Sequence, residues 1–217
     1  MEKQTLTLEH NFRPADGSVK NPPAIVMLHG FGSDENDLFS FASELPGKYA
    51  IISLKAPIRL QPYGNAWYNI YFDNTNGKFT DEKQAVVSRD LIADVIDEIV
   101  EKYEVDGEKI TLLGFSQGTI LSFAVALSYP EKVKNVVGLS GYIHKTLLKD
   151  GYENQDFSHL KVYTSHGTID QVLPIEWARE TQPFLEKLGI HCTYSEFPVG
   201  HGVAPDNFAE VMKFVEE

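Results

Sequence analysis

The sequence predicts an α/β fold, with a mostly parallel central sheet, helices on both of its faces and no large cap domain. The first observation is that short, uninterrupted apolar runs alternate with longer segments of helical periodicity. Apolar runs of this kind are typical of strands covered on both faces, and strands that alternate with helices form βαβ units. The second observation is that no linker or repeat divides the 217 residues, so residues 1–217 are expected to form a single domain.

Each expected strand is a run of apolar and β-branched residues. The six runs cover residues 24–28, 49–54, 110–113, 133–139, 161–164 and 192–197. In the first ten residues Thr and Leu alternate instead, which predicts a further strand at the amino terminus.

The expected helices have apolar residues three and four positions apart. Residues 91–103 carry acidic side chains on the opposite face, and the helix of residues 205–215 starts with a proline suited to the first turn. Residues 119–127 are mostly apolar, which predicts a buried helix. A fourth helix is expected over residues 177–188, with a kink or break caused by Pro183.

One segment, residues 57–80, does not follow the alternation. It holds Tyr63, Trp67, Tyr68 and Tyr71 among Gly, Asn and Pro residues. Two interpretations stay open. The segment is either a small hairpin packed on the sheet edge or an apolar wall beside an active site, because long structured insertions often serve binding.

Charge and cysteine content exclude several classes of partner. Lys and Arg number 19 against 31 Asp and Glu, a net charge of −12, and this field repels nucleic-acid backbones and anionic lipid surfaces. No apolar stretch approaches the ~18 residues of a membrane span, so no stable membrane insertion is expected. Cys192 is the single cysteine and can form no internal disulfide. A cytoplasmic protein is expected, with an exported form left open if a leader has been removed.

A candidate nucleophile lies in residues 114–118, Gly-Phe-Ser-Gln-Gly, between an expected strand and an expected helix. A strand, a sharp turn and a helix are the context in which Gly-x-Ser-x-Gly presents a nucleophilic serine. The glycines lack the Cβ atoms that would collide, and the helix N-terminus offers free N–H groups to a developing anion. Ser116 is therefore the candidate nucleophile, and the alternative is a glycine-rich turn with an idle serine.

A serine hydroxyl needs a base that accepts its proton, and the base needs a carboxylate that fixes its tautomer. With this motif the chain order is serine, acid, histidine, which excludes His10 and His29. His201 lies between two glycines in a loop after the last expected strand, where the backbone could place its imidazole over the serine. Asp170 follows the strand that begins at residue 161, at the same edge of the sheet as Ser116 and His201.

Acyl transfer also requires hydrogen-bond donors to the oxyanion of the tetrahedral intermediate. One candidate is the N–H of Gln117, next after the nucleophile, and the other is the N–H of Phe31 in the glycine-rich loop that follows residues 24–28. His29 and His166 each precede a glycine after a strand, and both are expected to be structural.

Together these residues resemble the small phospholipase/carboxylesterase family of α/β-hydrolases, which includes the acyl-protein thioesterases. The resemblance spans nearly the whole chain and rests on Leu-His-Gly-Phe-Gly at 28–32, Ala-Pro at 56–57, Trp-Tyr at 67–68, Gly-Phe-Ser-Gln-Gly at 114–118, His-Gly-Thr-Ile-Asp at 166–170 and Gly-His-Gly at 200–202. It implies an α/β-hydrolase fold, the triad Ser116, Asp170 and His201, and Phe31 and Gln117 as oxyanion donors.

Three positions depart from the family pattern. Thr119, Asn69 and Ser165 stand where the family often has Gly, Asp and Arg. None of them belongs to the triad, so the hydrolytic function is still expected. The departures weaken the transfer of any particular substrate preference.

The leading hypothesis is a serine carboxylesterase that hydrolyses short- to medium-chain esters through an acyl-enzyme, without metal or cofactor. Trp67 and Tyr68 are expected to wall the acyl site, and a small ester or acyl compound is the expected partner. A second hypothesis keeps the triad and makes the protein an acyl-protein thioesterase or lysophospholipase. A third is a ligand-binding protein on a hydrolase scaffold that has lost turnover. A homodimer stays open.

Overall fold

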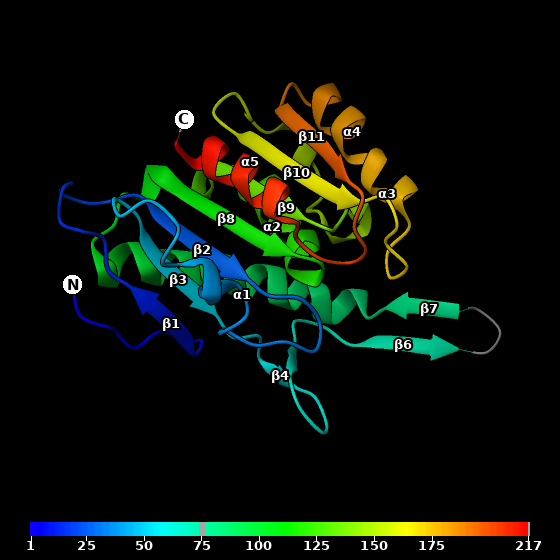
Figure 1. Cartoon of the computed structure of the whole chain (residues 1–217), viewed down its shortest axis with the longest axis horizontal. Coiled ribbons are helices and arrows are strands. Elements are labelled where there is room, and N and C mark those ends of the chain that lie inside the picture. Colours follow the sequence, from blue (N-terminus) through cyan, green and yellow to red (C-terminus); the bar gives the residue numbers. More distant parts are fainter. Residues whose placement is uncertain (74–76, 217) are drawn as a thin grey trace.

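A seven-stranded sheet forms the centre of the computed structural model, which describes residues 1–73 and 77–216 (Figure 1). The strand order is β1-β3-β2-β8-β9-β10-β11, in which β1 is antiparallel to β3 and the other neighbours are parallel. The bounds of these strands are β1 His10–Arg13, β2 Ala24–Leu28, β3 Ala50–Leu54, β8 Ile110–Phe115, β9 Asn135–Leu139, β10 Lys161–Gly167 and β11 His191–Phe197. The six apolar runs thus correspond to the six parallel strands.

Burial on both faces of the sheet explains why the strands are apolar without alternation. All five residues of β2 are 0 % exposed, yet they belong to two different cores. Val26 and Leu28 contribute to the core on one face, and Ile25 and Met27 contribute to the core on the other face. A polar residue at either set of positions would lose its hydration without gaining a partner.

The helices cover the two faces unequally. The first core is closed by residues of α1 (Glu82–Tyr103), α2 (Gln117–Ser128) and α4 (Thr181–Lys187). The second is closed by α5 (Pro205–Glu216) and the 3₁₀ turn at Leu38–Phe41, and α5 lies in front of the sheet in Figure 1. The mostly parallel sheet, helices on both faces and the lack of a large cap domain in the described ranges confirm the predicted fold class.

The expected strand within the first ten residues is wrong. The first strand begins only at His10, although Leu6 and Leu8 are buried as an alternating pattern requires. The backbone N–H of Thr7 donates to the Glu98 carboxylate, and that of Gln4 to the hydroxyl of Tyr103. Side chains of α1 therefore accept the backbone hydrogen bonds of a segment that the pattern assigned to a sheet.

The helix expected over residues 177–188 is broken, as predicted, into α3 (Ile175–Arg179) and α4. The break falls before Pro183 and not at it. Pro183 lies in the first turn of α4, where the missing N–H would have had no partner within the helix.

The insertion at residues 57–80 forms two hairpins instead of one. Strands β4 (Ile58–Arg59) and β5 (Asn65–Ala66) make the first, and β6 (Ile70–Asp73) and β7 (Gly77–Thr80) make the second; residues 74–76 lie outside the described residues. A bridge between Asn65 and Ser33 joins the first hairpin to the loop after β2. The insertion is thus attached at the carboxyl end of the sheet, from which the second hairpin projects in Figure 1. None of the helices in the described ranges combines the length and apolar character that crossing a bilayer requires.

Candidate active site

Three loops at the carboxyl end of the sheet bring Ser116, His201 and Asp170 together. Ser116 follows β8, Asp170 follows β10 and His201 follows β11. The Nε2 atom of His201 lies 2.9 Å from Ser116 Oγ, and its Nδ1 atom lies 2.7 Å from Asp170 Oδ2. The three residues predicted from the motifs therefore form one continuous hydrogen-bonded chain.

The turn that presents Ser116 is strained. Its backbone has φ 53° and ψ −114°, a conformation that costs a non-glycine residue roughly 1–3 kcal/mol. A Cβ atom on Gly118 would lie 1.8 Å from the carbonyl oxygen of Leu28, and one on Gly114 would lie 2.5 Å from that of Gly118. The expectation that these two glycines remove collisions at the turn is confirmed.

Asp170 is held as a buried carboxylate. Its side chain is 0 % exposed, and its Oδ1 atom accepts hydrogen bonds from the backbone N–H groups of Val172 (2.8 Å) and Leu173 (3.0 Å). Burial raises the pKa of this carboxyl, but the hydrogen bonds from Leu173, His201 and Val172 outweigh burial and hold the pKa below its usual range. Asp170 is therefore ionised at neutral pH and can accept a hydrogen bond from His201 Nδ1–H.

Direct contact between two loops sets the position of His201. The N–H of Ile169, next to Asp170, donates to the carbonyl of Val199 at 3.2 Å, and a Cβ atom on Gly167 would lie 2.3 Å from the carbonyl oxygen of Gly200. Gly202 has no atom within 4 Å of an added Cβ, and Gly200 has only one, at 3.9 Å; neither has a positive φ. The packing at Gly167 fixes the loop, and the imidazole lies beside Ser116 as expected without a close contact or a positive φ at either flanking glycine.

The two candidate oxyanion donors lie on separate segments near Ser116. Gln117 is the first residue of α2, where N–H groups have no partner within the helix. Phe31 follows His29 and Gly30 in the loop after β2, and an added Cβ on Gly30 would lie 3.3 Å from the Cβ of Ser116. The loop therefore passes directly beside the candidate nucleophile.

Trp67 and Tyr68 do not lie where a wall of the acyl site was expected. Their side chains are 0 % and 1 % exposed, so neither offers an open surface to a substrate. The indole Nε1–H of Trp67 donates to the carbonyl of His29 at 2.9 Å. Both rings pack in the core under α1 and α2 because they are large and apolar, and Trp67 is thereby placed underneath the loop that contains Phe31.

Both histidines expected to be structural are buried and hydrogen-bonded to their loops. His29 Nδ1 lies 2.8 Å from the carbonyl of Gly30, and His29 Nε2 accepts the N–H of Ala56 at 3.0 Å. Burial lowers the pKa of His29, in keeping with a neutral ring. His166 Nε2 lies 3.0 Å from the carbonyl of Leu173.

Three features of the site escaped the sequence analysis. His166 Nε2 lies 3.3 Å from Asp170 Oδ2, and the position of a histidine four residues before the acid was the available signal. Ser140, at the end of β9, has φ 51° and its Oγ lies 3.5 Å from the carbonyl of Gly202. The side chain of Gln117 bonds to the backbones of Trp67 and Tyr68. No motif marks the last two contacts, because each depends on segments that meet only in the fold.

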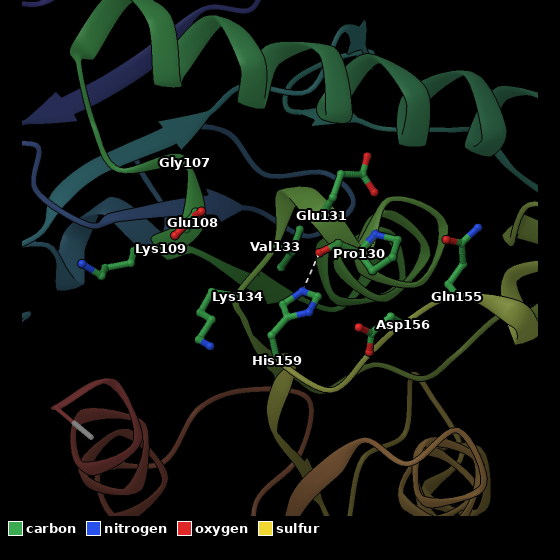
Figure 2. Close-up of a pocket in the computed structure, with 10 residues that line it drawn as sticks. All are labelled: Gly107, Glu108, Lys109, Pro130, Glu131, Val133, Lys134, Gln155, Asp156 and His159. Carbon is green, nitrogen blue, oxygen red and sulfur yellow. Dashed lines mark hydrogen bonds between the residues drawn. The ribbon is translucent and has the colours of Figure 1, made fainter.

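A pocket of about 600 Å³ lies at the opposite end of the sheet (Figure 2). Its lining includes Lys109, Lys134 and His159, which precede β8, β9 and β10 respectively. Because these residues mark the amino ends of the strands and the candidate triad follows the carboxyl ends, the pocket is separate from the candidate active site.

Comparisons with known proteins agree with the motifs and the fold. A model of the phospholipase/carboxylesterase family matches residues 11–217. Acyl-protein thioesterase 1 of Candida albicans is 26% identical over 94% of each chain, and that of Debaryomyces hansenii is 27% identical over 89% of this chain and 90% of its own. The crystal structure of the Bacillus cereus carboxylesterase has a TM-score of 0.83 at 17% identity and covers 97% of this chain and 94% of its own, which shows a shared fold.

The fold and the matched family together define a serine hydrolase of the α/β-hydrolase class. The chain belongs to the phospholipase/carboxylesterase family, and it is a carboxylic-ester hydrolase. The resemblance predicted from the six motifs is confirmed.

Proposed function

We propose that the protein is a serine carboxylesterase that hydrolyses short- to medium-chain carboxylic esters through an acyl-enzyme. Ser116 is the nucleophile, His201 the general base and then acid, and Asp170 the carboxylate that orients the imidazole. The observation that carries this proposal is the chain of hydrogen bonds from Ser116 Oγ through both nitrogens of His201 to Asp170 Oδ2, at 2.9 and 2.7 Å.

In the acylation step, His201 Nε2 accepts the proton of Ser116 as the serine oxygen attacks the ester carbonyl carbon. The developing imidazolium donates its Nδ1–H to the ionised Asp170, whose charge stabilises it. The N–H groups of Phe31 and Gln117 donate to the oxyanion. Collapse of the tetrahedral intermediate breaks the bond to the alkoxide, which takes the proton from His201 and leaves as the alcohol.

Deacylation repeats the same steps with water as the nucleophile. His201 Nε2 accepts a proton from the water, hydroxide adds to the acyl carbon, and the proton returns to Ser116 Oγ as the carboxylic acid departs. His201 takes up and gives back one proton in each half of the reaction. The enzyme therefore ends the cycle with Ser116 and His201 in their starting protonation states.

Apolar side chains next to the site residues favour an acyl substrate. Phe31, Ile169 and Val172 are 43 %, 63 % and 51 % exposed; Phe31 carries a candidate donor N–H, and the other two lie within two residues of Asp170. Exposed apolar groups gain free energy when a hydrocarbon chain covers them. These surface side chains can cover only a few methylene groups of an acyl chain. A longer chain would therefore gain little additional binding free energy, so short and medium chains are the expected substrates.

The second candidate function is hydrolysis of acyl thioesters or lysophospholipids with the same residues. The relatives from Candida albicans and Debaryomyces hansenii support it, since both carry the name acyl-protein thioesterase 1 and align over about nine-tenths of this chain. The proposed chemistry accommodates either substrate, because a thiolate leaves without needing the proton of His201 and an alkoxide needs it.

A comparison of matched substrates tests the proposal and ranks the two candidates. The second-order constant kcat/KM should be measured for p-nitrophenyl esters from acetate to laurate, each beside a thioester of the same acyl chain. A maximum at acetate to octanoate with esters preferred supports the carboxylesterase. A preference of tenfold or more for thioesters, or for the longest chains, favours the second candidate.

Replacement of Ser116 tests the nucleophile. Ser116→Ala should retain its fold and lose ester hydrolysis by about 10⁶-fold, because the residues of a triad act as a unit. Ser128→Ala, at the other end of α2, is the matched control and should keep its activity, since Ser128 Oγ accepts the N–H of Lys149 and lies at the end of the helix away from Ser116. A fluorophosphonate probe should label Ser116 alone; ester hydrolysis by Ser116→Ala at the normal rate would contradict the assignment.

A further inference from the structure

The two proposed oxyanion donors are carried by segments that are far apart in the sequence. Phe31 belongs to the loop after β2, and Gln117 begins α2. An oxyanion hole stabilises the transition state only if its donors are held in place before the reaction. Some contact must therefore fix the loop relative to the helix, and buried hydrogen bonds around Trp67 provide one.

The first part of this connection is the side chain of Gln117, which is 2 % exposed. Its Oε1 atom accepts the backbone N–H of Trp67 at 2.8 Å, and its Nε2 group donates to the backbone carbonyl of Tyr68 at 2.8 Å. Both ends of the amide are used, so the side chain has one orientation and ties the start of α2 to the segment after β5.

The second part is the indole of Trp67. The ring is fully buried, and its single donor, Nε1–H, reaches the carbonyl oxygen of His29 at 2.9 Å. His29 lies two residues before Phe31. Since Trp67 is bonded to Gln117 through its backbone and to His29 through its side chain, it spans the distance between the helix and the loop.

The third part is the imidazole of His29, which holds the loop itself. His29 Nε2 accepts the N–H of Ala56 at 3.0 Å, so the proton of the neutral ring is on Nδ1, which donates to the carbonyl of Gly30 at 2.8 Å. Together with the bond from the Trp67 indole to the His29 carbonyl, the bond to the Gly30 carbonyl restrains the peptide groups on both sides of Gly30. The carbonyls of His29 and Gly30 thus both accept hydrogen bonds. Because the Gly30 carbonyl and the Phe31 N–H belong to the same peptide group, these bonds also restrain the N–H of Phe31.

We propose that the indole N–H of Trp67 is a positioning group for the oxyanion hole, and that Gln117, Trp67 and His29 form a bridge that sets the spacing of the Phe31 and Gln117 N–H groups. This inference rests on the proposed function, because it assumes that these two N–H groups bind the oxyanion. Trp67 is buried and touches no reacting atom, so its effect is confined to the transition state. Substrate binding in the ground state is left unchanged.

The direct test is Trp67→Phe, which removes the indole N–H and keeps an aromatic ring. For p-nitrophenyl butyrate, kcat should fall about 10- to 100-fold, less than the 10²–10³-fold loss of a donor itself, and KM should stay within about twofold. The affinity for a trifluoromethyl ketone of the same acyl length, whose hemiketal oxygen occupies the oxyanion site, should fall by the same factor as kcat. A kcat within twofold of the unmodified protein, or a change in KM alone, overturns the proposal.

Tyr49→Phe is the matched control for the loss of one buried hydrogen bond. The Tyr49 hydroxyl donates to the carbonyl of Val215 at 2.7 Å, at the start of β3 and away from the three site loops. This variant should lower the midpoint of thermal unfolding with kcat unchanged, and Trp67→Phe should lower the midpoint further because the smaller ring also leaves a cavity. A fall of kcat equal to that of Trp67→Phe would show that general destabilisation explains both, and would overturn the proposal.

Gln117→Met tests the same bridge with Trp67 intact and decides the question if Trp67→Phe does not fold. It removes both amide contacts, and it should reduce kcat with little change in KM; unchanged kcat overturns the proposal. Where both variants fold, their effects on kcat should be less than additive in the double variant, since they interrupt one chain of contacts. Fully additive effects overturn the bridge.

Ser116→Ala, assayed in parallel, separates the two levels of inference. Normal hydrolysis by Ser116→Ala overturns the proposed function. An inactive Ser116→Ala combined with a fully active Trp67→Phe overturns only the role of Trp67.

Discussion

The two ends of the sheet use polar residues in different ways. At the carboxyl end, Asp170 and Gln117 are buried with every polar atom of their side chains bonded, and Ser116 and Ser140 have strained backbones. At the amino end, a hollow of about 600 Å³ has a lining that includes the exposed charged residues Glu108, Lys109, Glu131 and Asp156. The difference teaches that the proposed site of chemistry is marked by converging, fully bonded groups and not by the volume of a pocket.

Topology explains the difference. All strands of a parallel sheet end at the same edge. The loops that follow them therefore bring residues from distant parts of the sequence around one point. The loops at the amino end of this sheet lead from helices and turns into strands. Their contacts include the one between His159 Nε2 and the carbonyl of Pro130, 2.7 Å apart (Figure 2).

The largest effect that separates the two ends is expected for the carboxylates. Asp170→Asn should reduce kcat for p-nitrophenyl butyrate about 10⁴-fold, because an amide in this place favours the wrong tautomer of His201 and cannot stabilise its charge. Asp156→Asn, in the pocket at the amino end, is the matched control and should keep kcat within twofold. Similar losses in both variants would remove the distinction between the two ends.

The same comparison shows what the sequence could predict. Ser116, Asp170 and His201 were predictable because each follows an apolar run that is recognisably a strand, and parallel strands end at one edge. The elbow glycines were predictable because their requirement is local. The burial of Trp67 was not, because it depends on contacts with Gln117 and His29 that no local pattern encodes.

The wrong strand near the amino terminus has a related cause. Burial of Leu6 and Leu8 produces the alternation that a half-buried strand also produces, so the pattern reports burial and not the hydrogen-bonding partner. The actual partners are the side chains of Glu98 and Tyr103, some ninety residues further along the chain.

A smaller effect concerns stability and its dependence on pH. The pKa of Asp170 in the folded protein lies below its usual range, so ionised Asp170 stabilises the fold above the unfolded pKa of about 3.9, and this contribution is lost as the pH falls through the folded pKa. Asp170→Asn should therefore lower the free energy of unfolding by about 2 kcal/mol at pH 7, the scale of hydrogen bonds to a charged group. In urea titrations the difference between the two proteins should shrink below about pH 4. A difference that stays constant from pH 7 to pH 3 would contradict the role of the charge.

The smallest effect is expected at the amino end, where His159→Phe removes the hydrogen bond from Nε2 to the carbonyl of Pro130. Pro130 lies just beyond α2, and α2 begins beside Ser116, so the helix physically connects the two ends of the sheet. The free energy of unfolding should fall by about 1 kcal/mol, and kcat should stay within twofold.

All twelve residues of α2 are buried, and its first residue is fixed separately by the contacts of Gln117 with Trp67 and Tyr68. A loosened turn after the helix should therefore leave the elbow in place. A loss of kcat in His159→Phe comparable to that of Trp67→Phe would instead show that α2 transmits a disturbance along its length, and the two ends would have to be treated as one coupled unit.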